Sequence, residues 1–286
     1  MGKFCIVAQG GGMVACYHAG VIAALQEKFG LKELHCVIAT SGAAATYSYL
    51  ISNQQNLIEP IWIDLIKSGK FAVPWKFPPG KHIMNIDFLI DEMIKKRYPL
   101  DIEALKNSSI DLQVGVTDAN TAESRYFSKN AEVDFFELLR ASCAVPYFGR
   151  EKVLFNGRYY YDGIIASVTG LEKTLNEENI LMVLTRPPRP LKKMYFLRKI
   201  LRWLLIRNET PVLQKAIWDI MAKFDAIPQE AEKISKSKNL VIIQPKKKLP
   251  ILRVDTSLDR LQKTIKQGYN DTINHPQLES FFAKLT

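Results

Sequence analysis

The stretches that decide the fold are FCIVAQGGG (residues 4–12) and CVIATSGA (residues 36–43). Each begins with an apolar run and ends in small residues, a pattern typical of a buried parallel strand that enters a tight turn. Between them, Val21, Leu25 and Phe29 recur at four-residue intervals, which indicates a helix. Strand, helix and strand in this order predict a βαβ unit with a right-handed crossover.

The rest of the chain continues as strands and helices and then changes in composition. Asn156-Gly157 predicts a hairpin turn between two of the strands. After about residue 186, a proline-rich elbow precedes basic helical segments that extend to about residue 237. We therefore expect an α/β core over residues 1–186 and a basic, mostly helical C-terminal region, 187–286, that packs on it. Strands are predicted at 112–117, 125–127, 152–155, 159–161, 180–184 and 240–243, and helices at 135–143 and 257–268.

Composition and charge exclude several classes of protein. With 286 residues, of which 47% are hydrophobic and 24% charged, the chain is neither disordered nor a disulfide scaffold. The net charge is +10, but eight basic residues and no acidic one lie between Arg186 and Arg207, so the remainder is near neutral. That pattern argues against a general nucleic-acid-binding protein.

Cysteine usage and the lack of long apolar segments indicate a reduced, cytoplasmic-type protein. The four cysteines stand singly in apolar stretches without the paired spacing of a zinc site. The apolar run near the start is shorter than a signal peptide requires. No apolar stretch reaches the length of a membrane-spanning helix.

Ser41 lies in the turn ATSGA, between a predicted strand and a predicted helix. Small neighbours are typical of a sharp turn that raises a nucleophilic serine above a sheet, where the dipole of the following helix favours negative charge. The alternative is a serine that only caps that helix. The backbone N–H groups of Gly10, Gly11 and Gly12 are candidate donors to an oxyanion.

Nucleotide binding is the alternative function for the glycine triplet, but its spacing is wrong. Met13 and Ala15 occupy positions where a dinucleotide site has glycines, and no Gly-Lys-Ser/Thr follows. A serine nucleophile also needs a base. The four histidines suit packed or surface positions, whereas Asp162 ends a predicted strand directly before Gly163. The alternative for Asp162 is a simple Asp-Gly turn.

Taken together, the glycine triplet, the turn at Ser41 and Asp162-Gly163 resemble the patatin-like phospholipases. The segments YHAGV (17–21) and ASCAVPYF (141–148) are similar to family segments, and the resemblance covers about residues 4–186. The tail, with Pro245, Leu249-Pro250, Arg253 and Gly268-Tyr269-Asn270, resembles the C-terminal extension of a bacterial branch. The resemblance implies a three-layer α/β/α core with a mainly parallel sheet.

The resemblance also implies a catalytic role for each matching residue. Ser41 would attack a fatty-acyl ester, and Asp162 would accept its proton and later activate water. Gly10, Gly11 and Gly12 would form the oxyanion hole. Such a dyad uses no metal and no organic cofactor, and the products would be a fatty acid and a lysophospholipid or alcohol.

The chain departs from the family pattern at several positions. Ala39 and Ala43 replace the outer glycines of the serine turn, and Val14-Ala15 stands where a basic residue and glycine are usual. Ile164 follows Asp162-Gly163 where the family prefers a small residue. These departures leave open reduced activity, a changed substrate or a pseudoenzyme.

Residues 195–207 alternate bulky apolar groups with cations, and Arg198, Lys199, Arg202 and Trp203 are candidates for membrane contact. The alternative is a helix packed on the core with solvated cations. We expect a lipid acyl hydrolase, peripheral on the inner face of an anionic membrane, acting on a phospholipid or other acyl-ester lipid. An acyltransferase, a thioesterase or a lipid-binding pseudoenzyme are the alternatives. Nothing in the sequence indicates the head group, the acyl position and length, or the oligomeric state.

Overall fold

The core of the protein is a sheet whose central strands are apolar along their whole length. In β1 (Phe4–Ala8) every residue is buried, and in β7 (Asn179–Val183) every residue after the first. Strands of this kind are covered on both faces, as in a parallel α/β sheet. The computed structural model describes residues 2–72, 83–146, 148, 151–188 and 206–285.

Eight strands of the described part form one mixed sheet. Five of them are parallel, in the order β3-β2-β1-β7-β8, and the other three are antiparallel and extend the β3 edge. The mainly parallel sheet predicted from the sequence is thus confirmed. The remaining strands are β2 (Leu34–Thr40), β3 (Asp111–Asp118), β4 (Ser124–Ser128), β5 (Val153–Phe155), β6 (Arg158–Asp162) and β8 (Asn239–Ile243).

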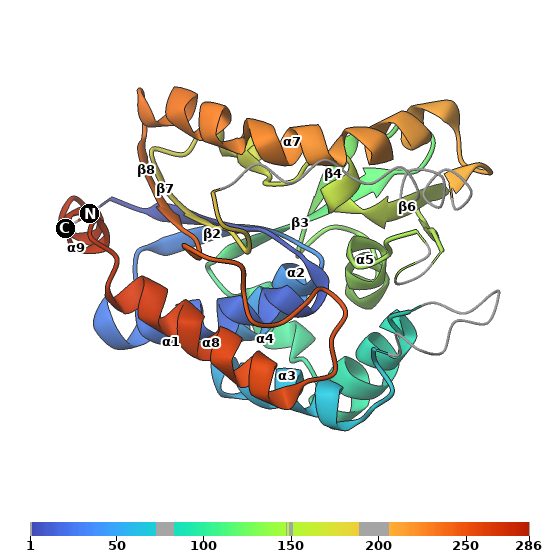
Figure 1. Cartoon of the computed structure of the whole chain (residues 1–286), viewed down its shortest axis with the longest axis horizontal. Helices are drawn as coiled ribbons and strands as arrows, with labels where there is room; N and C mark the ends of the chain where they lie inside the picture. Colours follow the sequence, from blue (N-terminus) through green and yellow to red (C-terminus); the bar gives the residue numbers. More distant parts are fainter. Residues whose placement is uncertain (1, 73–82, 147, 149–150, 189–205, 286) are drawn as a thin grey trace.

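Helices cover both faces of the sheet, which gives the predicted three layers. The long helix α7 lies along one face, while α1, α2 and α8 lie on the other (Figure 1). The two termini meet at one end of the molecule, where the Gly2 N–H donates to the Leu285 carbonyl. The α-helices are α1 (Tyr17–Lys28), α2 (Gly42–Ile51), α3 (Ile58–Lys67), α4 (Ile102–Asn107), α5 (Phe135–Ser142), α7 (Pro211–Ser235), α8 (Leu258–Ile273) and α9 (Leu278–Ala283). A π-helix, η3, spans Phe88–Arg97, and short 3₁₀ segments are η1 (Gly12–Cys16), η2 (Gln55–Leu57), η4 (Gly163–Ile165) and η5 (Leu171–Thr174).

Two glycines allow α8 to lie directly against α1. A Cβ added to Gly20 would lie 1.9 Å from the Ile265 carbonyl oxygen, and one added to Gly268 would lie 2.2 Å from the Tyr17 carbonyl oxygen. The Tyr17 hydroxyl also donates to Asp271 at 2.8 Å. The C-terminal helix is therefore fixed to the helix that follows the glycine triplet. The boundary at residue 186 stays a prediction.

The predicted strands and the Asn156-Gly157 hairpin are confirmed to within two residues. The helix predicted from Val21 and Leu25 is preceded by the 3₁₀ segment η1, where the Met13 N–H donates to the Arg253 carbonyl at 2.9 Å. The last amphipathic helix continues past Gly268 to Ile273, since that glycine serves close packing rather than termination. All four cysteines are buried and free. Within the described ranges, none of the helices has the length and hydropathy needed to cross a membrane.

Candidate active site

Ser41 occupies a strained position between β2 and α2. Its φ and ψ are 60° and −139°, and a residue with a side chain rarely adopts a positive φ. Such a conformation costs about 1–3 kcal/mol and persists only where the surroundings enforce it. The Ser41 side chain makes no capping hydrogen bond to α2. The hydroxyl is therefore not used as a helix cap.

A second serine holds this turn in place. The Ser41 N–H donates to Ser142 Oγ at 2.8 Å, and Ser142 Oγ donates to the Gly115 carbonyl at 2.8 Å. Ser142 ends α5 and Gly115 lies in β3, so the serine turn is tied to two neighbouring elements. Ala39 and Ala43, which replace the usual outer glycines, are both fully buried beside the turn. Their methyl groups are accommodated without loss of the turn.

The three glycines occupy two different places relative to Ser41. Gly10 packs behind the serine, where an added Cβ would lie 2.7 Å from Ser41 Cβ. Gly11 and Gly12 line a cavity together with Ser41. Gly12 has a φ of 66°, and a Cβ there would lie 2.6 Å from the Arg253 carbonyl oxygen. No hydrogen bond within the described part of the chain uses the N–H of Gly11 or Gly12.

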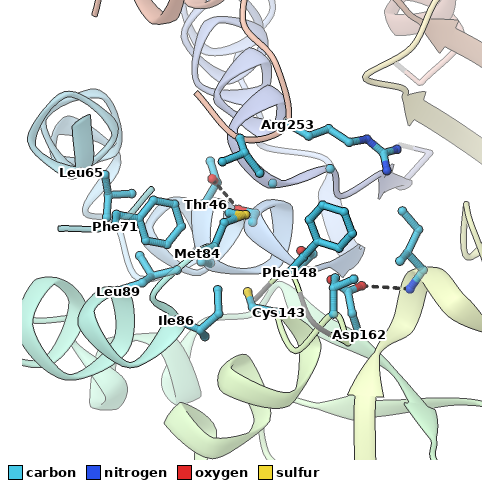
Figure 2. Close-up of a pocket in the computed structure, with 18 of the residues that line it drawn as sticks. Thr46, Leu65, Phe71, Met84, Ile86, Leu89, Cys143, Phe148, Asp162 and Arg253 are labelled. Atoms are coloured by element: carbon cyan, nitrogen blue, oxygen red, sulfur yellow. Dashed lines mark hydrogen bonds between the residues drawn. The ribbon is translucent and has the colours of Figure 1, made fainter. Parts of the chain in front are cut away.

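Asp162 ends β6 and is fixed by its backbone. Its N–H donates to the Ala144 carbonyl at 2.8 Å, and its carboxylate accepts the Ile164 N–H at 3.0 Å (Figure 2). Burial raises the pKa of the carboxyl from 3.8 to about 7, against the lowering effects of the Ile164 N–H, the Ser41 side chain and the Arg253 charge. A carboxylate with a pKa near neutrality suits a general base.

Ser41 and Asp162 line the same cavity. The Ser41 side chain lowers the pKa of Asp162, as the Arg253 charge also does. Cys143 lines the same cavity, but burial strongly raises the pKa of its thiol, which keeps it protonated. The structure therefore brings the two predicted catalytic residues together.

None of the described histidines lines this cavity. His18 is buried elsewhere, where its Nε2 lies 2.8 Å from the Gln9 carbonyl and burial lowers its pKa to about 4. His35 and His275 also bond to backbone carbonyls, and His82 lies outside the described residues. Asp162 is thus the base candidate that the described structure offers to Ser41.

The cavity has a volume of about 860 Å³ and walls that are mostly apolar. Figure 2 shows one end formed by Leu65, Phe71 and Leu89, with Asp162 and Arg253 at the other. The apolar walls come from α2, α3 and η3 on one side and from α7 on the other. Further apolar lining residues include Ala45, Ile58, Ile61, Trp62, Met84, Ile86, Ile217, Ile220 and Met221.

Three cavity residues, Arg186, Lys248 and Arg253, were not identified as site residues from the sequence. Arg186 is the first cation of the basic segment and Arg253 lies in the tail after Leu249-Pro250, but neither pattern indicates a cavity. Arg198, Lys199, Arg202 and Trp203, the predicted membrane contacts, lie outside the described residues.

The described cavity offers few potential metal ligands. Asp162 and Cys143 are its acidic and thiol groups, fewer than a zinc or calcium site requires. One other cluster lies at the amino ends of β1 and β2, where ligand atoms of Cys5, Cys36 and Glu177 all lie within 4.8 Å of one another. That cluster is remote from Ser41.

Comparisons with known proteins agree with this geometry. The family model for patatin-like phospholipase matches residues 6–175, more than half of the chain. The uncharacterized protein YjjU of Escherichia coli is 22% identical over 273 residues, which cover 93% of this chain and 75% of YjjU. The crystal structure of VipD from Legionella pneumophila has the same fold, with a TM-score of 0.50 and 16% identity over 99% of this chain and 67% of VipD. The chain belongs to the patatin-like phospholipase family.

Proposed function

We propose that this protein is a serine lipid acyl hydrolase of the phospholipase A or lysophospholipase type, with Ser41 and Asp162 as its catalytic dyad. The observation that supports this most is the strained Ser41 beside an Asp162 whose pKa is about 7, both at one large apolar cavity. The family match supports lipid hydrolase activity in general.

The proposed reaction has two halves. Ser41 Oγ attacks the ester carbonyl while its proton passes to the Asp162 carboxylate, and the proton then leaves with the alcohol product. Water next gives a proton to Asp162 and attacks the acyl-serine, which releases the fatty acid and restores Ser41. The N–H groups of Gly11 and Gly12, together with the start of α2, would stabilise the oxyanion in both halves.

We expect the apolar cavity to favour substrates with long acyl chains. Each buried methylene contributes about 0.8 kcal/mol to binding. The residues of α2, α3 and η3 provide this surface on the side of the cavity away from Arg253 (Figure 2). An acyl chain in that end places its ester at Ser41.

Fatty-acid release from mixed phospholipids tests the proposal. We expect release by the wild type, loss of at least about a thousandfold in Ser41→Ala, and a comparable loss in Asp162→Asn. Ser48→Ala is the matched control, because Ser48 is also a buried serine but lies within α2, bonds to the Ala44 carbonyl and does not line the cavity. Release that survives Ser41→Ala would refute the proposal.

Product analysis separates the remaining alternatives. If the acyl group appears on an added alcohol such as glycerol rather than as fatty acid, the enzyme is an acyltransferase. Faster cleavage of an acyl thioester than of the matched ester would make it a thioesterase. Binding of lipid without any turnover would make it a pseudoenzyme.

We also propose peripheral association with an anionic membrane through the basic segment. This rests on the sequence of residues 195–207, with Arg198, Lys199, Arg202 and Trp203 as the contacts. Co-sedimentation with vesicles tests it. Wild type should bind phosphatidylglycerol vesicles in preference to phosphatidylcholine vesicles, and Arg198→Gln/Lys199→Gln/Arg202→Gln should remove that preference.

A further inference from the structure

The wall of the cavity carries an excess of positive charge. Arg186, Lys248 and Arg253 line it, and Asp162 is the one acidic residue among the described lining residues. No ion pair in the described ranges joins any of the three cations to a carboxylate. The residues outside those ranges include no Asp or Glu side chain that would neutralise them.

Two of these cations are held close together by one aromatic ring. The Arg186 guanidinium lies 3.7 Å from the centre of the Phe224 ring, and the Arg253 guanidinium lies 5.8 Å from the same centre. Stacking of this kind fixes a guanidinium without neutralising its charge. Arg186 Nη1 is also buried without a hydrogen-bond partner in the described structure. A bound anion would supply both a hydrogen-bond acceptor for Arg186 Nη1 and the negative charge that balances the two guanidinium groups.

The backbone places this pair beside the reacting groups. Thr185, directly before Arg186, donates from its hydroxyl to the Gly10 carbonyl at 3.1 Å. The Arg253 carbonyl accepts the Met13 N–H at 2.9 Å, at the end of the glycine triplet. Figure 2 shows the Arg253 side chain at the Asp162 end of the cavity, and its charge lowers the pKa of that carboxyl. An anion held there lies near the ester that Ser41 attacks.

We propose that Arg186, Lys248 and Arg253 form a subsite for the phosphate of an acyl-ester lipid, and that the protein prefers lipids whose head group has a net negative charge. This inference rests on the proposed function. Guanidinium groups match phosphate geometry, and Asp162, the one carboxylate among the described lining residues, is already assigned to the reaction with Ser41. The site suits a phosphate a few bonds from the ester, as in a glycerophospholipid. All three cations lie outside residues 6–175, the part of the chain that the family model matches.

Binding to the Ser41→Ala protein tests the subsite without requiring catalysis. Isothermal titration would use monomeric 1-decanoyl-glycerol-3-phosphate, 1-decanoyl-glycerophosphocholine, 1-decanoylglycerol and inorganic phosphate. We expect the anionic lipid to bind at least about tenfold more tightly than the other three ligands. Equal affinity for the anionic and neutral lipids would overturn the proposal. Equal affinity for inorganic phosphate and the anionic lipid would show a free-phosphate site instead of a lipid head-group site.

Variants locate the preference on the named residues. Arg186→Gln or Lys248→Gln, each added to Ser41→Ala, should reduce the preference for the anionic lipid about tenfold. Lys246→Gln is the matched control, because Lys246 is exposed in the same Lys-Lys-Lys run but does not line the cavity. Lys248 is itself exposed, so its replacement leaves the fold intact and keeps the test decisive if Arg186→Gln fails to fold. An unchanged preference in Lys248→Gln and Arg186→Gln would overturn the assignment.

Hydrolysis by the wild type separates this inference from the proposed function. Cleavage of all three lipids with equal kcat/KM would leave the hydrolase in place and refute the subsite. Selective binding of the anionic lipid without cleavage of any of them would support the subsite and refute the hydrolase.

Discussion

The raised pKa of Asp162 makes a quantitative prediction about stability. Burial holds the carboxyl at a pKa of about 7, against 3.8 in the unfolded chain. Between these values the native state keeps a proton that the unfolded state has lost, so the stability of the wild type falls as pH rises from 3.8 through 7. Relative to its value at high pH, the free energy of unfolding contains a contribution from this carboxyl that is fully present below pH 3.8. That contribution is lost as the pH rises through 7.

Replacing this carboxyl with a neutral isostere removes the pH-dependent cost. At 1.36 kcal/mol per pKa unit, Asp162→Asn should be more stable than wild type by about 4 kcal/mol at pH 8. The same variant should equal the wild type below about pH 4. Its amide oxygen keeps an acceptor for the Ile164 N–H, which now bonds to the carboxylate at 3.0 Å.

Urea unfolding followed by tryptophan fluorescence at pH 4.5, 6 and 8 measures the difference. The stability gap between Asp162→Asn and wild type should widen steadily with pH over this series. Asp91→Asn is the control, because the Asp91 side chain is 41% exposed and its pKa is lowered, mainly by its hydrogen bond to Arg140. A gap that stays constant with pH, or a variant that is less stable than wild type at pH 8, would refute the reasoning.

Three further predictions follow from the same site. The kcat/KM for a soluble neutral ester should rise with pH as a single ionisation near 7, because Asp162 must be ionised to accept a proton. Since the Arg253 charge lowers the pKa of Asp162, Arg253→Gln should move that rise to higher pH in a pH–rate profile. Leu89→Trp should lower the ratio of kcat/KM for palmitoyl over butyryl esters, by about fourfold for each methylene that loses its contact, as measured with an acyl-chain series. Ser142→Ala should cost about 1–3 kcal/mol of stability and lower kcat more than it changes KM, because the Ser41 N–H loses its acceptor. Ser142→Thr should restore part of the stability and part of kcat. An unchanged kcat in Ser142→Ala would contradict this positioning role.

The parallel sheet and the serine turn were predictable because their signals are local. The apolar run from Phe4 to Ala8 is buried on both faces, and small residues surround Ser41 because the turn is tight. Asp162 was predictable as a residue type before Gly163, and its proximity to Ser41 came from the family resemblance. The raised pKa of Asp162 was not predictable, because it depends on burial by elements that are distant in the sequence.

The cationic wall and the cavity could not be predicted from local patterns. Arg186 and Arg253 meet over Phe224 only because β7, α7 and the segment before α8 converge at the carboxyl edge of the sheet. Gly268 looked like the end of a helix, and its role in contacting α1 requires knowledge of both helices. Such contacts depend on tertiary packing, which the spacing of residues within one element does not encode.

Covalent labelling tests the central claim most directly. The purified protein would be treated with a fluorophosphonate serine probe, and the modified peptide would be identified by mass spectrometry. The dyad predicts one adduct, on Ser41, that is absent from Ser41→Ala, retained in Ser48→Ala and formed much more slowly in Asp162→Asn. An unlabelled wild type that nevertheless binds lipid, or an adduct on a different serine, would contradict it.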